Sequence, residues 1–376
     1  YNEGLLVLLI SVDHEVLIQR LRTSFGITGI PLAWVESFLT NRTQEVSFSG
    51  SRSVIGQLLS GVPQGSVLGP LLFLAYTAEL FSIIARHGFK AHSYADDTQI
   101  YMSAPANSAP DAARRFSDCV ADVNTWMNRN RLKLNTDKTQ IIWVGSRQQL
   151  AKLVSTDVTL GSTTVGSSTT VVDLGFHLDN HLTMTAHVAH LSRSCYFQLR
   201  QLRSVRRSLS TDATISLIHA FVSSRLDYCN SLLYKISDGL LVKLQRIQNA
   251  AARLVTGVRR WEHITPVLRR LHWLPVRSRI VFKIATVVYK CLHGLAPLYL
   301  ARHCIPLTEV HGRGHLRSAA AHKLSEPRTH TKLAGSRLFS VCGPVVWNGL
   351  PERLRNHGLS LNAFRRELKT ELFKEL

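Results

Sequence analysis

The sequence predicts an α+β protein, with short antiparallel hairpins and helices in its first half and helices over most of its second half. Residues 92–101, HSYADDTQIY, hold two short β-type runs on either side of an aspartate pair, as expected for a hairpin. Residues 45–60 contain two more such runs around Gly50. From residue 184 onward, apolar residues recur at the spacing of amphipathic helices.

The elements before the aspartate pair alternate between strands and helices. We expect, in order, a buried strand over 5–10 (LLVLLI), helices over 14–25 and 31–39, the hairpin over 45–60, and a Gly/Pro-rich loop from 61 that becomes an apolar helix at Pro70. The loop lacks the GxxxxGK[ST] pattern, so it is not a nucleotide-phosphate loop of that kind.

The later elements lead into a helical region. We expect an amphipathic helix over 111–130, strand, turn and strand over 132–145, a linker or small polar hairpin over 155–170, a strand over 171–179, helices over 238–257, 277–294 and 361–376, and a loop or a segment ordered on binding over 305–335.

Positive charge is distributed unevenly along the 376 residues, whose formal net charge is +20. Residues 1–100 hold six Lys or Arg against eight Asp or Glu, whereas residues 101–376 hold 39 against 17. So large an excess favours a polyanionic partner, most simply nucleic acid, over a merely solvated surface. Composition alone leaves an anionic membrane surface open as a partner.

The apolar runs, such as VLGPLLFLAY, are shorter than the ~20 residues that span a bilayer. LLVLLI follows Glu3 rather than a basic residue, which is not typical of a signal peptide. The six cysteines are scattered without a CxxC pair, which indicates free thiols in a reducing compartment. The sequence therefore predicts an intracellular protein with no membrane partner.

The adjacent Asp96 and Asp97 allow two interpretations. Asp is common in turns, so a surface turn is the simpler one. Two neighbouring carboxylates repel each other, however, and a divalent cation between them removes that repulsion. Mg²⁺ prefers oxygen ligands, and a pair of such ions stabilises the attacking and leaving oxygens of phosphoryl transfer. Because neighbouring strand side chains point to opposite faces, such a site needs a third acid from an adjacent strand.

Four stretches occur in this order: GVPQGSVLGPLLF (61–73), YADDTQIY (94–101), NRNRLKLNTDKTQIIWVG (128–145) and DLGFHLD (173–179). Together they closely resemble the palm of reverse transcriptases from non-LTR (LINE-type) retrotransposons. LDYCNSLLY, LQRIQNAAARLVTG, LHWLPVRSRI and GPVVWNGLP resemble the region that follows the polymerase core in such elements. The resemblance covers almost the whole chain.

The resemblance implies the right-hand fold of polymerases. Residues 1–182 would hold partial fingers and the palm, an antiparallel sheet with helices. Residues 183–258 would form a helical thumb whose basic side chains follow the duplex backbone. Residues 259–376 would form a mostly helical basic region of unassigned role, for which gripping template RNA is a hypothesis. A nuclear location is implied, and most of the fingers and any endonuclease domain would lie outside the sequence.

The resemblance also implies individual roles. Asp96 and Asp97 match the metal-binding acids, with Asp96 as the direct ligand of two Mg²⁺ ions, or of Mn²⁺. Lys138 matches a lysine that protonates the leaving pyrophosphate, although by itself it reads as a solvated turn lysine. The implied partners are an RNA template, a DNA primer and dNTPs; the oligomeric state is left open. The other implied site residues are Gln64, Gly65 and Tyr94 against template and nucleotide, and Leu174 and Gly175 in the primer grip.

One stretch departs from the family pattern, which runs like LLVLLDLSAAFDTVDHEVL. This chain reads LLVLLISVDHEVL and is about six residues shorter there. Ile10 follows Leu9 where the third metal-binding aspartate would stand, and the aromatic residue that excludes a sugar 2′-hydroxyl is also absent. Loss of a shared ligand should disable a two-metal site. We therefore predict a crippled polymerase, through gene deletion or a mis-assigned splice; the alternative is an inactive nucleic-acid-binding remnant.

Other candidates are weaker. The basic turn RSVRR (203–207) could contact backbone phosphates. Trp261, Trp273 and Trp347 could stack on bases, although lone tryptophans beside apolar residues are more often core. Tight zinc-site spacing is absent among His303, Cys304, His311, His315, His322 and His330.

Overall fold

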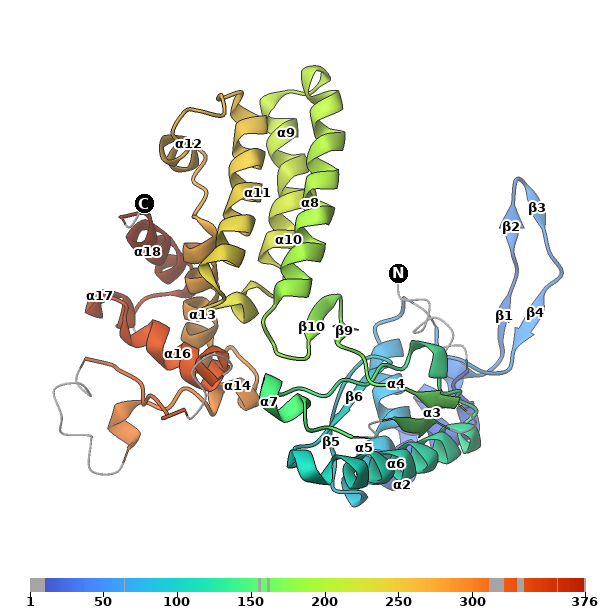
Figure 1. Ribbon diagram of the computed structural model, residues 1–376. Helices are drawn as coiled ribbons and strands as arrows, with labels where there is room; N and C mark the ends of the chain where they lie inside the picture. The colour runs from blue at the N-terminus through green and yellow to red at the C-terminus, as the bar shows by residue number, and fades with distance from the viewer. Residues whose placement is uncertain are drawn as a thin grey trace. The chain divides into compact units, whose positions relative to one another are not determined.

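The structure is a computed structural model that describes residues 11–63, 65–154, 157–160, 163–310, 321–329, 335–356 and 358–374. The chain divides into two compact units, Tyr1–Leu174 and Gly175–Leu376. The first unit mixes helices with two-stranded sheets, and the second is mostly helical (Figure 1). The predicted α+β composition is confirmed. The strand expected over 5–10 lies outside the described residues.

The described part of the first unit, from residue 11, opens with two helices, of which the first is capped by Asp13. Its carboxylate accepts a hydrogen bond from the backbone N–H of Val16 at 3.0 Å, so one free donor of the helix start is satisfied. The elements of the unit are α2 (His14–Phe25), α3 (Gly29–Leu39), β1 (Arg42–Gln44), β2 (Ser47–Phe48), β3 (Ser51–Arg52), β4 (Gly56–Leu58), α4 (Gly69–Thr77), α5 (Glu79–Arg86), β5 (Lys90–Tyr94), β6 (Asp97–Tyr101), α6 (Ala109–Arg129), α7 (Arg147–Leu150), β7 (Val158–Leu160), β8 (Thr163–Val165) and β9 (Thr170–Asp173).

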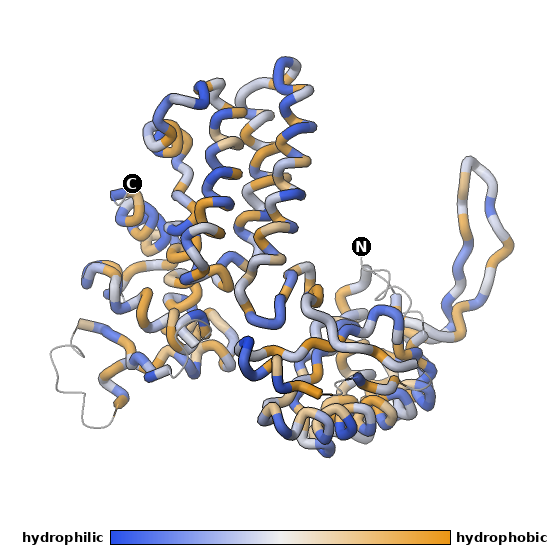
Figure 2. Tube along the Cα trace, in the orientation of Figure 1, coloured by the Kyte–Doolittle hydropathy of each residue, from blue (hydrophilic) through white to orange (hydrophobic). Residues whose placement is uncertain are grey.

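The hairpin predicted over 45–60 is confirmed as an antiparallel ribbon in which β1 pairs with β4 and β2 with β3. Ser49 (φ 49°) and Gly50 (φ 82°) form its turn, and two left-handed residues match the twist of a tight hairpin. Phe48 and Val54 of this ribbon are exposed. Figure 2 shows hydrophobic stretches along the ribbon.

The strands predicted over 132–145 are wrong. The structure has a 3-10 turn at Thr136–Lys138 and a single bridge from Ile141 to Ser167. Leu134, Ile141 and Trp143 instead pack on a small core with the buried side chains of β7. The apolar residues that predicted strands are therefore buried by side-chain packing, without the backbone hydrogen bonds of a sheet. The polar hairpin favoured at 155–170 is present as β7 and β8.

Helices α4 and α5 are separated only by Ala78, which is itself helical in φ and ψ. Taken together, Gly69–Arg86 is long and apolar enough, by length and composition alone, to cross a membrane. The sequence alone predicts that the apolar run VLGPLLFLAY is too short to cross a bilayer. That prediction is wrong for the helical stretch as a whole, because the stretch continues through α5. Two cores bury side chains of this run: one holds Leu72, Phe73 and Tyr76, and the other holds Leu80, Ile83 and Ile84. A helix that packs in a protein core has the same apolar composition as one that crosses a membrane.

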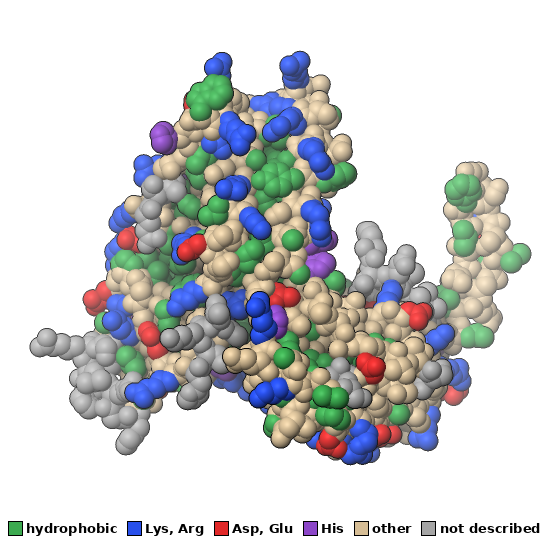
Figure 3. All heavy atoms as spheres, viewed as in Figure 1, with side chains coloured by type: hydrophobic (Ala, Val, Ile, Leu, Met, Phe, Trp, Pro, Cys, Tyr) green, Lys and Arg blue, Asp and Glu red, His purple; other side chains and the backbone are tan. Residues whose placement is uncertain are grey.

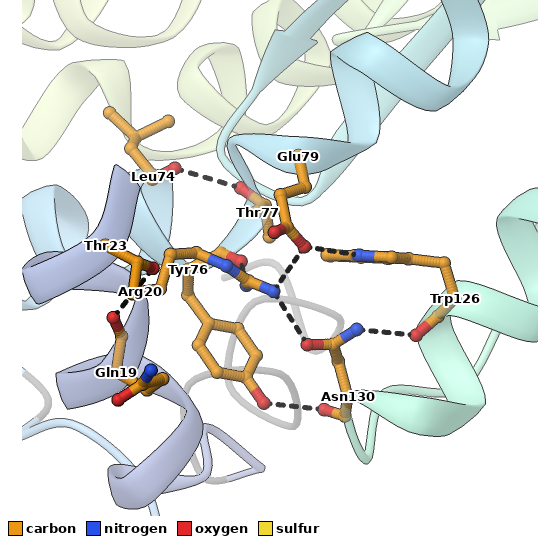
Figure 4. A network of polar contacts seen from close by, with 9 residues as sticks. All are labelled: Gln19, Arg20, Thr23, Leu74, Tyr76, Thr77, Glu79, Trp126 and Asn130. Carbon is orange, nitrogen blue, oxygen red and sulfur yellow. Dashed lines mark hydrogen bonds and ion pairs between the residues drawn. The ribbon is translucent and has the colours of Figure 1, made fainter. Parts of the chain in front are cut away.

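A buried arginine joins the helices of the first unit (Figure 4). Arg20 of α2 donates to the carbonyl oxygen of Tyr76, to the Glu79 carboxylate at 2.6 Å and to Asn130 Oδ1 at 3.0 Å. The Tyr76 hydroxyl donates to the carbonyl of Asn130 at 2.7 Å, and the Trp126 indole donates to Glu79 at 3.0 Å. The guanidinium thereby fixes α2 to the α4–α5 junction and to the end of α6.

The second unit is built on one large core. In Figure 1 its long helices α8 and α11 run side by side, and α13 packs against α11. Its elements are β10 (Phe176–Asp179), α8 (Thr185–Val205), α9 (Thr211–Ile218), α10 (Ser224–Asp227), α11 (Asp238–Thr256), α12 (Thr265–Arg270), α13 (Val276–Leu292), α14 (Leu298–Ala301), α16 (Phe339–Asn348), α17 (Glu352–Arg355) and α18 (Leu361–Lys374). The helices predicted over 238–257, 277–294 and 361–376 are confirmed.

Three histidines meet where β10 contacts α8. The His187 ring is buried and stacks on Phe176 with ring centroids 3.8 Å apart. Its Nδ1 accepts from the backbone N–H of His177 at 3.4 Å, and among the described residues its Nε2 has no hydrogen-bond partner. Burial, then the charges of His177 and His190, lower the pKa of His187 to about 4.

We expect the second unit to lose stability as the pH falls from about 6.5 toward 4. The unfolded chain protonates His187 near its ordinary pKa, whereas the folded chain keeps it neutral, so acid favours unfolding by on the order of 2 kcal/mol. His187→Phe preserves the stacking and should flatten the dependence, as measured by urea unfolding between pH 7 and 4.5. An unchanged pH slope in the variant would contradict this assignment.

Candidate active site at the Asp96–Asp97 hairpin

The predicted aspartate hairpin is confirmed. Strands β5 and β6 pair antiparallel from Lys90–Tyr101 to Tyr94–Asp97, which leaves Ala95 and Asp96 as the turn. Ala95 has φ 55°, a left-handed conformation that is strained for a residue with a Cβ. Such strain persists where the surrounding structure holds it, often at functional sites. The turn places Asp96 at the hairpin tip and Asp97 at the start of β6.

The carboxylate of Asp96 is partly buried and poorly compensated. Its Oδ1 is inaccessible to solvent and has no hydrogen-bond partner among the described residues. Burial raises the pKa of Asp96, a hydrogen bond from its own backbone N–H lowers it, the charge of Asp97 raises it and Lys138 lowers it. A buried acceptor beside a second negative charge is the arrangement that a bound cation would satisfy. The pair therefore fits a divalent ion.

Lys138 ends the 3-10 turn Thr136–Lys138, where its backbone N–H donates to Asn135 Oδ1 at 3.2 Å. Its side chain is exposed, and its charge acts on Asp96. The structure thus brings together three of the predicted site residues, from the hairpin and from a turn some 40 residues further along the chain.

Asp173, at the end of β9, is an acid near this site that the sequence analysis did not single out. Its carboxylate accepts a hydrogen bond from Gln99 Nε2 at 2.5 Å. Burial raises the pKa of Asp173, Gln99 lowers it and the charge of Asp97 raises it. Within the described ranges, no three His, Cys, Asp or Glu side chains are placed to hold one ion. Asp173 is therefore an electrostatic neighbour of the pair and not a third ligand.

Of the other predicted site residues, Gly65, Leu174 and Gly175 lie in turns and Tyr94 ends strand β5. Gly65 has φ 78°, and a Cβ there would meet nothing within 4 Å, so the loop offers open backbone. Tyr94 is exposed and faces Asp97 across the ladder. Leu174 (φ 46°) and Gly175 (φ 80°) form the turn between β9 and β10. Gln64 lies outside the described residues.

The basic turn at 203–207 is partly structural. Arg206 donates to the carbonyls of Leu254 and Val255 and to that of Leu209, each at 3.0 Å, so it fixes the end of α11. Arg203 and Arg207 remain exposed. Of the predicted stacking tryptophans, Trp273 and Trp347 are core residues, whereas Trp261 is exposed. The zinc candidates His311, His315 and His330 lie outside the described residues.

The net positive charge belongs to the second unit. Residues 1–174 contain 14 Lys or Arg and 14 Asp or Glu, whereas residues 175–376 contain 31 and 11. Figure 3 shows the Lys and Arg side chains spread over these helices. Residues 180–211, which include all of α8, hold no acid, and α8 exposes Arg193, Tyr196, Phe197 and Arg200 beside an open hollow of about 610 Å³. Exposed arginines can contact phosphates and exposed aromatic rings can stack on bases, so this face of α8 has both features of a nucleic-acid-binding surface.

Comparison with known proteins agrees with this geometry. A sequence model of the family described as reverse transcriptase (RNA-dependent DNA polymerase) matches residues 10–178. Among relatives from Drosophila melanogaster, the probable RNA-directed DNA polymerase from transposon BS is 29% identical over 72% of this chain and 30% of its own length. That from transposon X-element is 25% identical over 59% and 24%, and that from mobile element jockey 24% over 59% and 25%. The chain spans less than a third of these relatives.

The aspartate hairpin and the family match define the class of protein, because the chain contains a reverse transcriptase domain. Within that class the chain is similar to the LINE-type reverse transcriptases of non-LTR retrotransposons, to which its Drosophila relatives point. The family generally uses divalent metal ions and acts on RNA and DNA.

Proposed function

We propose that this chain is the polymerase part of a LINE-type element, built to add dNTPs to a primer 3′ end on an RNA template by two-metal catalysis. The observation that carries the proposal is the buried Oδ1 of Asp96, which has no hydrogen-bond partner in the described part of the chain and lies beside the charge of Asp97. Mg²⁺ bound there would supply the positive charge that stabilises the attacking and leaving oxygens. Mn²⁺ would satisfy the same oxygen ligands.

The remaining residues of the site have supporting roles. Lys138, whose charge acts on Asp96, donates a proton toward the leaving pyrophosphate. Gln64, Gly65 and Tyr94 hold the template and incoming nucleotide, and the Leu174–Gly175 turn holds the primer. Residues 1–182 act as partial fingers and palm, 183–258 as thumb and 259–376 as a further nucleic-acid-binding region. A nuclear location is part of this role, because primer ends on chromosomal DNA are there.

This copy is crippled, because the third acid of the two-metal site is missing from its sequence between Leu9 and Val12. Asp173 does not replace it, since its charge interacts with that of Asp97 but, among the described residues, it joins no group that could hold one ion. A second function, binding of nucleic acid without catalysis, is favoured by the charge of +20 carried by residues 175–376.

Repair of the sequence tests both functions. Replacing Ile10–Ser11 with DLSAAFDT restores the family pattern, and we expect Mg²⁺-dependent primer extension to rise about a hundredfold or more. The matched control carries the same insertion with Asn in place of its first Asp. Extension on an RNA template with a labelled DNA primer measures the effect.

The possible outcomes separate the two ideas. Robust synthesis by the unrepaired chain would show that it is not crippled. A repaired chain no more active than its Asn control would overturn the polymerase assignment of the site and leave nucleic-acid binding as the function.

A further inference from the structure

Trp261 is exposed in a way that its neighbours in the fold do not explain. It lies in the loop between α11 and α12 and is 76% exposed, whereas Trp273 and Trp347, which follow it in the second unit, are core residues. A tryptophan is rarely this exposed without a binding partner, because burying its large ring removes more apolar surface from water than burying most other side chains. The exposure therefore needs a reason.

The loop around Trp261 is held in one shape. Arg253 of α11 donates to the carbonyl oxygens of Arg259, Arg260 and Glu262 at 3.4, 3.3 and 3.2 Å. The carboxylate of Glu262 in turn accepts from the backbone N–H of Arg259 at 2.7 Å. These bonds satisfy the loop backbone from within, so the exposed ring is presented by a fixed loop.

The ring is also placed beside positive charge. The guanidinium carbon of Arg259 lies over the Trp261 ring, 5.3 Å from its centroid. Arg260, Arg269 and Arg270 are exposed, and the one nearby acid in residues 253–270 is Glu262, whose carboxylate is engaged with the loop backbone. Arg270 and His263 border an open hollow of about 530 Å³ beside the loop. A stacking platform among cations suits a base flanked by phosphates.

We propose that the loop at residues 257–263 is a second nucleic-acid contact, which binds an unpaired strand by stacking one base on Trp261 and pairing the neighbouring phosphates with Arg259, Arg260 and Arg270. The contact reads the aromatic face that every base has, so it is tolerant of sequence. It does not depend on catalysis and would operate in an inactive copy. A polyanion is favoured over a protein partner by the charge excess of residues 175–376, which hold 31 Lys or Arg against 11 Asp or Glu.

The test uses the full chain and fluorescence anisotropy with labelled oligo(rU), oligo(dT) and a blunt RNA duplex. We expect Trp261→Ala to weaken binding of both single strands about tenfold and to leave duplex binding within about twofold. Trp261→Phe, which keeps an aromatic face, should retain most of the affinity. Arg260→Ala should lower the slope of log affinity against log salt by about one.

The matched control is Trp34→Ala, which removes another exposed tryptophan, 56% accessible, from α3 of the first unit, where acids and bases balance. Its single-strand affinity should stay within about twofold. The proposal is overturned if Trp261→Ala binds single strands like the parent, if it loses duplex and single strands equally, or if it instead abolishes self-association seen by light scattering. A thermal unfolding curve like that of the parent checks that the variant folds.

Discussion

Asp96→Asn in the repaired chain lowers dNTP incorporation by about a thousandfold, because the amide keeps the shape of the side chain but removes the charge that holds the metal. Its Oδ1 is a buried oxygen without a hydrogen bond among the described residues, so a neutral group there gives up little folding energy. Single-turnover primer extension, with Mg²⁺ titrated to saturation, measures the loss and shows whether excess metal restores it.

The control for this prediction is Asp173→Asn. Burial raises the pKa of Asp173, and the charge of Asp97 raises it further. Its carboxylate accepts a hydrogen bond from Gln99 and belongs to no three-residue cluster in the described ranges. An Asn oxygen still accepts the Gln99 bond, so we expect activity within about threefold. Equal losses at both positions would mean that net charge, rather than ligation by Asp96, governs the site.

Arg20→Met destabilises the first unit by about 3 kcal/mol. The change removes a buried guanidinium that joins α2 to Tyr76, Glu79 and Asn130, and it leaves their oxygens without that donor. Hydrogen exchange of the intact chain, resolved to the amides of α2 and α6, measures the loss where it occurs.

Arg114→Met is the comparison, since Arg114 forms an exposed i,i+3 pair with Asp111 on α6. Such exposed pairs contribute little to stability, so we expect exchange at the amides of α2 and α6 to match that of the parent chain. Similar effects at the two positions would contradict a structural role for the Arg20 network.

The aspartate hairpin could be predicted from residues 92–101 alone, because this stretch contains two strand-forming runs, a turn between them and two acids at the turn. Asp173 could not, because its proximity to Asp97 depends on Gln99 reaching across from β6 to the end of β9, a contact between residues 74 apart in sequence. The strands expected over 132–145 failed for a related reason, since apolar side chains there found a core rather than a pairing edge. The sequence did not distinguish exposed Trp261 from buried Trp273 and Trp347, because the neighbouring residues do not reveal that Arg253 fixes the loop.

Acids and bases cancel in residues 1–174, which hold the aspartate pair, and the whole charge excess lies in residues 175–376. A mutation that removes a catalytic acid therefore leaves the positive charge of the second unit unchanged. A chain of this kind that lost its catalytic acids would keep the charge excess of residues 175–376, and with it the sequence-independent attraction for a phosphate backbone.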